Sequence, residues 1–190
     1  MSWSNCRLLL SIKDYNEINY YINICTKYNL TQRQLAEKIK FEEYERLSES
    51  AKVKLVTNEK PLLPDLVKNP ILIKNTNKYN EISEKILQQI ILEDIESFMM
   101  ELGSGFCFIG KEYPIKFGNN YNYIDLLLYN IEFNCYVVIE LKVTRLKKEH
   151  IGQIEVYMNY IDRKLKRFNQ DKTIGIIICK ENNEYIIEYC

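Results

Sequence analysis

Histidine is nearly absent from this sequence, which contains only His150, and none of the six cysteines forms a C-x-x-C pair with another. A single histidine excludes any metal site that is built on several histidines. Some of the cysteines lie inside apolar, strand-like runs. We therefore expect buried, reduced thiols, as is usual in a cytoplasmic protein.

Long apolar runs and an excess of charge are also missing. No apolar stretch reaches the ~18 residues that a membrane-spanning helix needs, and the first residues, MSWSNCRLLLS, lack the features of a secretory signal. We therefore expect a cytoplasmic location. The formal net charge is zero, so any surface that binds a polyanion must be a local patch. With 190 residues, of which 46% are hydrophobic, the chain can form one full domain and a smaller one.

The first part of the chain, residues 1–57, reads as a helical module. Helices are predicted over Asp14 to Thr26 and over Gln32 to Lys40, with Thr31 as the N-cap of the second. Two helices around a short turn have the outline of a helix-turn-helix. In that case base or phosphate contacts would come from Gln32, Arg33 and Gln34. A plain helical hairpin is the more common meaning of this pattern. Glu42 to Val56 is also expected to be helical.

Three prolines within ten residues interrupt the next segment, which we assign as a linker over residues 58–80. Residues 81–190 then change from a helical to a strand-like pattern. A long apolar stripe predicts a helix from Glu81 to Leu102. Strands are predicted over Phe106–Ile109, Tyr113–Phe117, Tyr121–Tyr129 and Phe133–Val143, followed by a helix over Lys147–Arg167 and strands over Thr173–Cys179 and Tyr185–Tyr189. This order indicates an α/β fold in which helices flank a mixed sheet.

Charged residues inside two of these strands are the main functional signal. Asp125 lies in the middle of an apolar strand, where aspartate is disfavoured because its carboxylate competes for backbone hydrogen bonds. Glu140 and Lys142 are two residues apart on the next strand and therefore point to the same face. If the two strands pair, two carboxylates and an ammonium group converge at one place.

Such a group of side chains suits phosphodiester hydrolysis. Two nearby carboxylates repel each other unless a cation lies between them, and Mg²⁺ prefers carboxylate oxygens. A neighbouring lysine can stabilise the charge that builds up on a phosphate. The alternative is a solvated strand face with a cross-strand charge pair, which is the usual meaning of an E-x-K pattern.

The long helix that follows adds further polar residues. Gln153 and Tyr157 are four residues apart and share a face, so Gln153 could orient Lys142 and Tyr157 could pack on the strand that bears Glu140. The alternative is a polar border of a buried helix. Basic residues follow the motif and crowd the helix end: Arg145, Lys147, Lys148, Arg163, Lys164, Lys166 and Arg167. Each could neutralise a phosphate, although a solvated helix end favoured by the dipole explains the last four as well.

Several segments together resemble one known family. These are ELGSGFCFIG, YIDLLLYN, VVIELKV, GQIEVYMNYID and TIGIIICK, which occur in order between Glu101 and Lys180. They resemble the YhcG-type family of bacterial nucleases, a branch of the PD-(D/E)XK superfamily with a restriction-endonuclease-like fold. The upstream segments SWSNCRLLLSIKD, LTQRQLAEKI and YERL resemble the end of its N-terminal helical domain, which is thought to help bind DNA. Family members carry a helical stretch before this point, so we expect a truncated N-terminal domain.

The resemblance implies a metal-dependent nuclease that cuts DNA. Mg²⁺ or Mn²⁺ would be bound by Asp125, Glu140 and the backbone carbonyl of Leu141, with Lys142 as a catalytic residue and Gln153 in support. A further acidic residue of the first helix is expected near the metal, and Glu93, Glu96 and Glu101 are the candidates. A homodimer is a further expectation. The rival interpretations are a nucleic-acid-binding or assembly module that no longer cuts, and a nuclease that acts on RNA.

Overall fold

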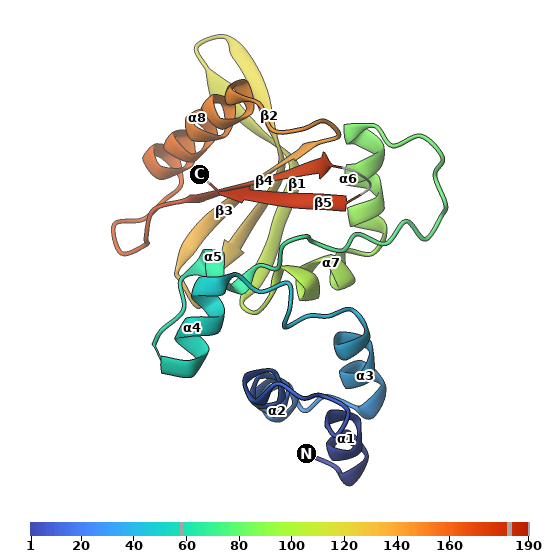
Figure 1. The fold of residues 1–190 in the computed structure, drawn as a ribbon. Coiled ribbons are helices and arrows are strands. Elements are labelled where there is room, and N and C mark those ends of the chain that lie inside the picture. Colours follow the sequence, from blue (N-terminus) through green and yellow to red (C-terminus); the bar gives the residue numbers. More distant parts are fainter. Residues whose placement is uncertain (58, 182–183, 190) are drawn as a thin grey trace. The chain divides into compact units, whose positions relative to one another are not determined.

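The computed structural model describes residues 1–57, 59–181 and 184–189. The chain divides into two compact units, Met1–Lys68 and Asn69–Cys190 (Figure 1). This boundary falls inside the linker predicted over residues 58–80, and residue 58, where that linker begins, lies outside the described residues.

The first unit is helical throughout. Its helices are α1 (Trp3–Leu9), α2 (Tyr15–Tyr28), α3 (Gln32–Lys40), α4 (Glu49–Thr57) and α5 (Leu63–Leu66). Ser2 and Asp14 cap the first two helices by accepting a backbone N–H with their side chains. The core of this unit is formed by the buried residues Leu9, Tyr20, Tyr21, Cys25, Leu35, Tyr44, Leu47 and Ala51.

The predicted pair of helices is present as α2 and α3. Asn29 takes the left-handed conformation that ends α2, and Thr31 caps α3 in a capping box with Gln34. The side-chain oxygen of Gln34 therefore accepts a hydrogen bond from the N–H of Thr31, at 2.9 Å. Arg33 is exposed and lies 3.5 Å from Glu37. These contacts are compatible with either a helix-turn-helix or a plain hairpin.

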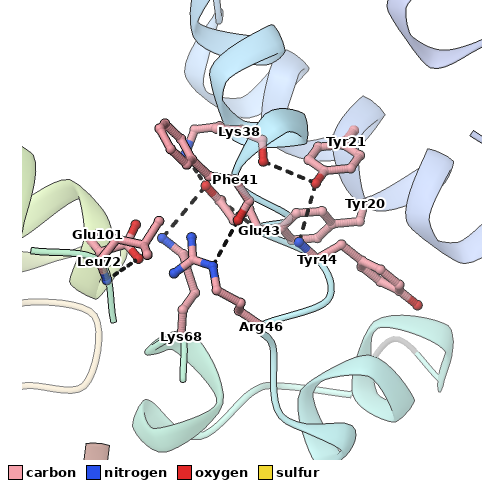
Figure 2. A network of polar contacts seen from close by, with 10 residues as sticks. All are labelled: Tyr20, Tyr21, Lys38, Phe41, Glu43, Tyr44, Arg46, Lys68, Leu72 and Glu101. Carbon is pink, nitrogen blue, oxygen red and sulfur yellow. Dashed lines mark hydrogen bonds and ion pairs between the residues drawn. The ribbon is translucent and has the colours of Figure 1, made fainter. Parts of the chain in front are cut away.

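The prediction of a helix over Glu42 to Val56 is wrong for the first half of that segment. Turns follow α3, and α4 begins at Glu49. Glu42 has a φ of 51°, the left-handed conformation that stops a helix. The turn places Glu43 inside the unit, where its carboxylate accepts a hydrogen bond from Tyr20 Oη at 2.8 Å and pairs with Lys38 Nζ at 2.7 Å (Figure 2).

Lys68 Nζ lies 3.8 Å from the same carboxylate. Burial alone would raise the pKa of Glu43, but Lys68, Lys38 and the Tyr20 hydroxyl outweigh it and lower that pKa. Glu43 is therefore a buried, paired anion, and a continuous helix through this segment would have left it without these partners.

The second unit contains a five-stranded sheet between helices (Figure 1). Its elements are α6 (Glu84–Glu93), α7 (Ile95–Leu102), β1 (Phe106–Phe117), β2 (Asn120–Asn130), β3 (Cys135–Lys142), α8 (Lys148–Lys164), β4 (Ile174–Glu181) and β5 (Glu184–Tyr189). The strands are ordered β1-β2-β3-β4-β5, and only β3 and β4 are parallel. The predicted mixed α/β fold is therefore observed.

Both faces of the sheet are covered. Helix α8 packs on β3 and β4, whereas α6 packs on β3 and α7 on β1. Ile154, Tyr157 and Ile161 of α8 join a core cluster with Val138 and Ile177 of the central strands. Every residue of β3 except Tyr136 is buried, as expected for a strand inside a sheet that is covered on both sides.

Two boundaries in this unit differ from the prediction. The single helix expected over Glu81 to Leu102 is divided at Asp94, whose φ of −136° ends α6 and whose side chain caps α7 through Ser97 N. The two short strands expected before residue 118 form one strand, β1, whose register against β2 shifts between Phe108 and Gly110. The shift is a β-bulge, which interrupts the alternation of side chains without ending the strand.

The described cysteines are all free, and Cys25, Cys135 and Cys179 are buried. Cys107 is exposed on β1, so the expectation of buried thiols is wrong there, and Cys190 lies outside the described residues.

Among the described helices, none combines the length and the apolar character that crossing a bilayer requires.

Candidate active site

Strands β2 and β3 bring the predicted residues together. The two strands are antiparallel, and Leu126 pairs with Ile139, so the next position along places Asp125 beside Glu140. Lys142 lies two residues further along β3, on the same face as Glu140. The convergence expected from the sequence is therefore present in the structure.

Asp125 is half-buried and is held from two sides. Its Oδ2 accepts a hydrogen bond from the backbone N–H of Leu141 at 2.8 Å. Its backbone carbonyl accepts one from Gln88 Nε2 of α6 at 3.0 Å. Burial raises the pKa of Asp125, although the Leu141 N–H and the charge of Lys142 oppose this effect. The hydrogen bond thus fixes the direction of the carboxylate, and the surroundings disfavour its negative charge.

Glu140 is 3% exposed, and only one of its two carboxylate oxygens has a hydrogen-bond partner among the described residues. Its Oε1 accepts a hydrogen bond from Lys142 Nζ at 2.9 Å. Its Oε2 is buried and has no hydrogen-bond partner among the described residues. Burial, and then the charge of Asp125, raise the pKa of Glu140 to about 7. A buried carboxylate oxygen with no partner is costly, which is the condition that a bound cation would relieve.

Lys142 completes the group. It is 8% exposed, and its Nζ lies 3.6 Å from Glu84 Oε2 as well as 2.9 Å from Glu140 Oε1. Burial opposes its charge, but the hydrogen bond and charge of Glu140, together with Glu84, raise the pKa of Lys142. Lys142 is therefore a positively charged proton donor in a half-enclosed site.

Gln153 and Tyr157 contact each other. Gln153 Nε2 donates to Tyr157 Oη at 2.8 Å, so its amide bonds to this tyrosine rather than to Lys142. Tyr157 is 5% exposed and packs in the core cluster that contains Val138 of β3, as expected. Burial raises the pKa of Tyr157, and the charges of Glu140 and Asp125 act in the same direction.

The acidic residue that the first helix brings to this site is Glu84, which was not among the candidates. Glu93 accepts hydrogen bonds from Asn77 and Tyr79, and Glu101 accepts one from the backbone N–H of Leu72. Glu96 is exposed in the first turn of α7. The contacts of Glu93 and Glu101 are therefore with residues outside this site.

Helical spacing indicates that Glu84 lies on the sheet side of α6, but it does not indicate which strand residue Glu84 meets. Glu84 is three and four residues before Leu87 and Gln88, both of which are buried against the sheet side of α6. Gln88 was missed for a different reason. It acts through its hydrogen bond to the Asp125 backbone, a contact that no spacing rule predicts.

The group suits a hard divalent cation. Asp125 and Glu140 offer carboxylate oxygens. The Oε2 of Glu140 is buried without a hydrogen-bond partner among the described residues, so a cation beside it would be stabilising. No group of three or more histidine, cysteine or acidic side chains in the described part of the chain could hold a metal ion. Mg²⁺ is commonly held by one or two carboxylates and keeps several waters, so a pair of acids is sufficient.

Comparison with known proteins identifies the family of the chain. The family model described as the YhcG PDDEXK nuclease domain matches residues 64–190. The chain is 26% identical over 179 residues to the Escherichia coli (strain K12) protein named "Putative nuclease YhcG". That alignment covers 91% of this chain and 48% of the relative, so the chain spans about half the length of the protein it matches.

Two solved structures are also similar. One is the crystal structure of a repair endonuclease from Pyrococcus abyssi, with 22% identity, a TM-score of 0.39, and coverage of 54% of this chain and 39% of that chain. The other is the structure of an EndoMS–dsDNA2 complex, with 20% identity, a TM-score of 0.37, and coverage of 56% and 42%. The family match, which covers most of the chain, confirms the predicted restriction-endonuclease-like fold. The chain belongs to the YhcG PDDEXK nuclease family.

Proposed function

We propose that this protein is a metal-dependent nuclease that hydrolyses phosphodiester bonds in DNA at the site formed by Asp125, Glu140 and Lys142. The observation that carries the proposal is the pair of adjacent carboxylates on β2 and β3, one of which has a buried, unpartnered oxygen next to a lysine. Membership of a nuclease family supports the reaction class.

The metal ligands in this proposal are Asp125, Glu140 and the backbone carbonyl of Leu141. Bound there, Mg²⁺ or Mn²⁺ would polarise a phosphoryl oxygen and lower the pKa of a bound water. The Leu141 N–H holds the Asp125 carboxylate in one direction, because it donates to Oδ2. Glu140 can offer its Oε2 to a cation, since this oxygen has no hydrogen-bond partner among the described residues.

Lys142 is the residue that faces the phosphate in this proposal. Its raised pKa keeps the proton on Nζ, so it can donate to a non-bridging oxygen as negative charge develops there. Glu140 and Glu84 hold its position through contacts of 2.9 and 3.6 Å. Gln153 acts as a positioning residue through Tyr157, whose ring packs beneath the strand that bears Glu140.

The remaining features of the proposal concern the substrate and the rest of the chain. Residues 1–57 are a helical module that helps to bind DNA, joined to the nuclease domain of residues 81–190 by the segment 58–80. A DNA substrate accords with the cytoplasmic location expected from the sequence. A homodimer stays a prediction.

The test is cleavage of supercoiled, linear and branched DNA, and of RNA, in Mg²⁺ or Mn²⁺ and in EDTA. We expect cleavage that requires the metal and that falls by a factor of about 100 or more in Asp125→Ala and Lys142→Ala, because each removes a group that stabilises charge in the transition state. Glu155→Gln, an exposed acid on α8, is the matched control. Undiminished metal-dependent cleavage by Asp125→Ala would disprove the proposed site, and cleavage of RNA alone would disprove the DNA substrate.

A further inference from the structure

A second surface feature lies on the nuclease unit, away from the two carboxylates. An open groove with a volume of about 430 Å³ runs between the turn that joins β1 to β2 and the outer half of α8. Figure 1 shows that hairpin end, in yellow, beside α8, in orange. The lining residues are Lys116, Phe117 and Gly118 from the hairpin, and Val156, Asn159, Tyr160, Arg163 and Lys164 from the helix.

The groove is positively charged. Lys116, Arg163 and Lys164 are exposed, and no acidic residue is among the described residues that line the groove. Within the described chain, none of these three cations forms an ion pair with a carboxylate. Two separate elements thus direct uncompensated positive charge at one groove, which favours a polyanion. The helix dipole can explain cations at the end of α8, but it does not explain Lys116, which lies on the hairpin.

The groove is also aromatic. Phe117 of the hairpin and Tyr160 of α8 both line it, and their rings are in edge-to-face contact with centres 5.3 Å apart. Phe117 is 37% exposed although it is a large apolar side chain. Lys116 Nζ lies 5.5 Å from the ring centre of Tyr121, a further exposed aromatic residue. Cations that follow a phosphate backbone, interleaved with rings on which bases can stack, are typical of surfaces that bind single strands. A duplex would hide the faces of its bases from these rings.

Helix α8 links the groove to the candidate active site, because it carries Gln153 as well as the lining residues Val156, Tyr160 and Arg163. Gln153, Val156, Tyr160 and Arg163 follow one another at helical spacings of three or four residues. The rise of an α-helix places Tyr160 about 10 Å further along the axis than Gln153. That span corresponds to about two or three nucleotides of an extended strand.

We infer that this groove binds an unpaired DNA strand that leads to the bond to be cut, so that the substrate contains a single-stranded region next to the cleavage position. The inference rests on the proposed function, since it extends the same site to a class of substrate. The rings of Phe117 and Tyr160 stack on bases, and Lys116, Arg163 and Lys164 neutralise phosphates.

The experiment measures binding in EDTA, so that it does not depend on cleavage. The 190-residue chain is titrated into a labelled oligo-dT, a blunt duplex, and a duplex with a single-stranded tail, over a range of salt concentrations. Lys116→Glu/Arg163→Glu is compared with Lys78→Glu/Lys172→Glu, which makes the same change in charge at exposed sites outside the groove. We expect the first variant to weaken binding of oligo-dT and of the tailed duplex by about tenfold or more. Its slope of log Kd against log salt should fall by about 1.4, or about 0.7 for each phosphate that the protein no longer neutralises.

A second variant tests for base stacking. Phe117→Ala is measured against oligo-dT and against an abasic oligonucleotide of the same length, which retains the phosphates and lacks the bases. We expect about fivefold or greater loss for oligo-dT and no change for the abasic strand. Equal binding by the groove and control variants would overturn the inference, as would equal losses for the blunt duplex and the single strand. Because wild-type cleavage is assayed separately, failure of the nuclease proposal and failure of this one are distinguishable.

Discussion

In the nuclease unit, the side chain of Glu140 is both ionisable and buried, and burial of its charge lowers the free energy of unfolding. A buried acid with an unpartnered oxygen and a pKa raised to about 7 destabilises the unit while it is ionised. Asp125 adds to this effect, because its charge lies close to that of Glu140. The site thus lowers the stability of the free protein, and the proposed binding of a cation would restore it.

This view predicts a specific thermal response to metal. Mg²⁺ or Mn²⁺ at about 100 times its Kd should stabilise the wild-type protein by about 2.7 kcal/mol, because the ion binds only the folded chain. Asp125→Ala should lose this response, since it removes a ligand. Thermal unfolding with and without EDTA provides the measurement. Glu155→Gln should respond as the wild type does, and a full metal response in Asp125→Ala would contradict the assigned ligands.

Among the elements, the contact between α8 and β4 depends on the absence of a side chain at Gly175. A Cβ there would lie 2.5 Å from Met158 Sδ and 3.0 Å from Ile154 Cδ1, both on α8. The glycine therefore lets the helix that carries Gln153 and the groove residues approach the sheet closely. A larger residue would force the side chains of Met158 and Ile154 to move.

Gly175→Ala should accordingly destabilise the nuclease unit by about 1–3 kcal/mol through overpacking. Adding Met158→Ala should recover part of this loss, because Met158 Sδ is the nearest atom. The matched control is Gly152→Ala on α8, where an added Cβ meets nothing within 4 Å. That change should stabilise the helix by up to about 1 kcal/mol. Urea unfolding measures all of these variants, and equal stability of Gly175→Ala and wild type would refute the packing argument.

The same elements show how far a sequence predicts this fold. Strands β2 to β5 were predictable because apolar runs bounded by turn residues mark them, and α8 was predictable because its helical spacing persists along its length. The division at Asp94 was not predictable, because the apolar stripe continues across it and only the local backbone conformation of Asp94 ends α6. The bulge in β1 was not predictable either. One extra residue breaks the alternation of side chains in the same way as the end of a strand does, so a single strand was predicted as two.

The candidate site was predictable in its centre and not at its edges. Asp125, Glu140 and Lys142 follow from strand pairing, which is a local property of β2 and β3. Glu84 depends on where the first turn of α6 meets the sheet, and Gln88 depends on a contact with a backbone atom. Such contacts are set by the packing of helix on sheet, which a single sequence does not specify.

At the scale of the whole molecule, each of the two units has its own core and its own buried charges. In the helical unit the anion of Glu43 is stabilised by Lys38, Lys68 and Tyr20, so its folded pKa lies below the ordinary value of 4.5. A lowered acid pKa means that the folded unit holds its proton less tightly than the unfolded chain. The stabilisation from Glu43 is therefore complete above pH 4.5 and is lost as the pH falls through the folded pKa.

We predict that Glu43→Gln lowers the unfolding free energy of the helical unit at pH 6 and flattens its loss of stability below pH 4.5. Urea unfolding of the full chain, followed by the amide NMR signals of residues 15–40, would measure this. Glu45→Gln, an exposed neighbour, should leave both features unchanged. A profile for Glu43→Gln that runs parallel to that of the wild type would show that the pairing contributes nothing.

The order of the strands has a consequence for synthesis of the protein on the ribosome. Since β1 to β5 lie side by side in the order in which they are translated, each strand can pair with its predecessor as soon as it emerges. The β2–β3 hairpin is local in sequence and can form before α8 and β4 exist. Asp125 and Glu140 would then be adjacent in a nascent chain still exposed to water, and they would lose that water only when the later elements cover them. The acidic pair can thus be assembled before the elements that bury it have been made.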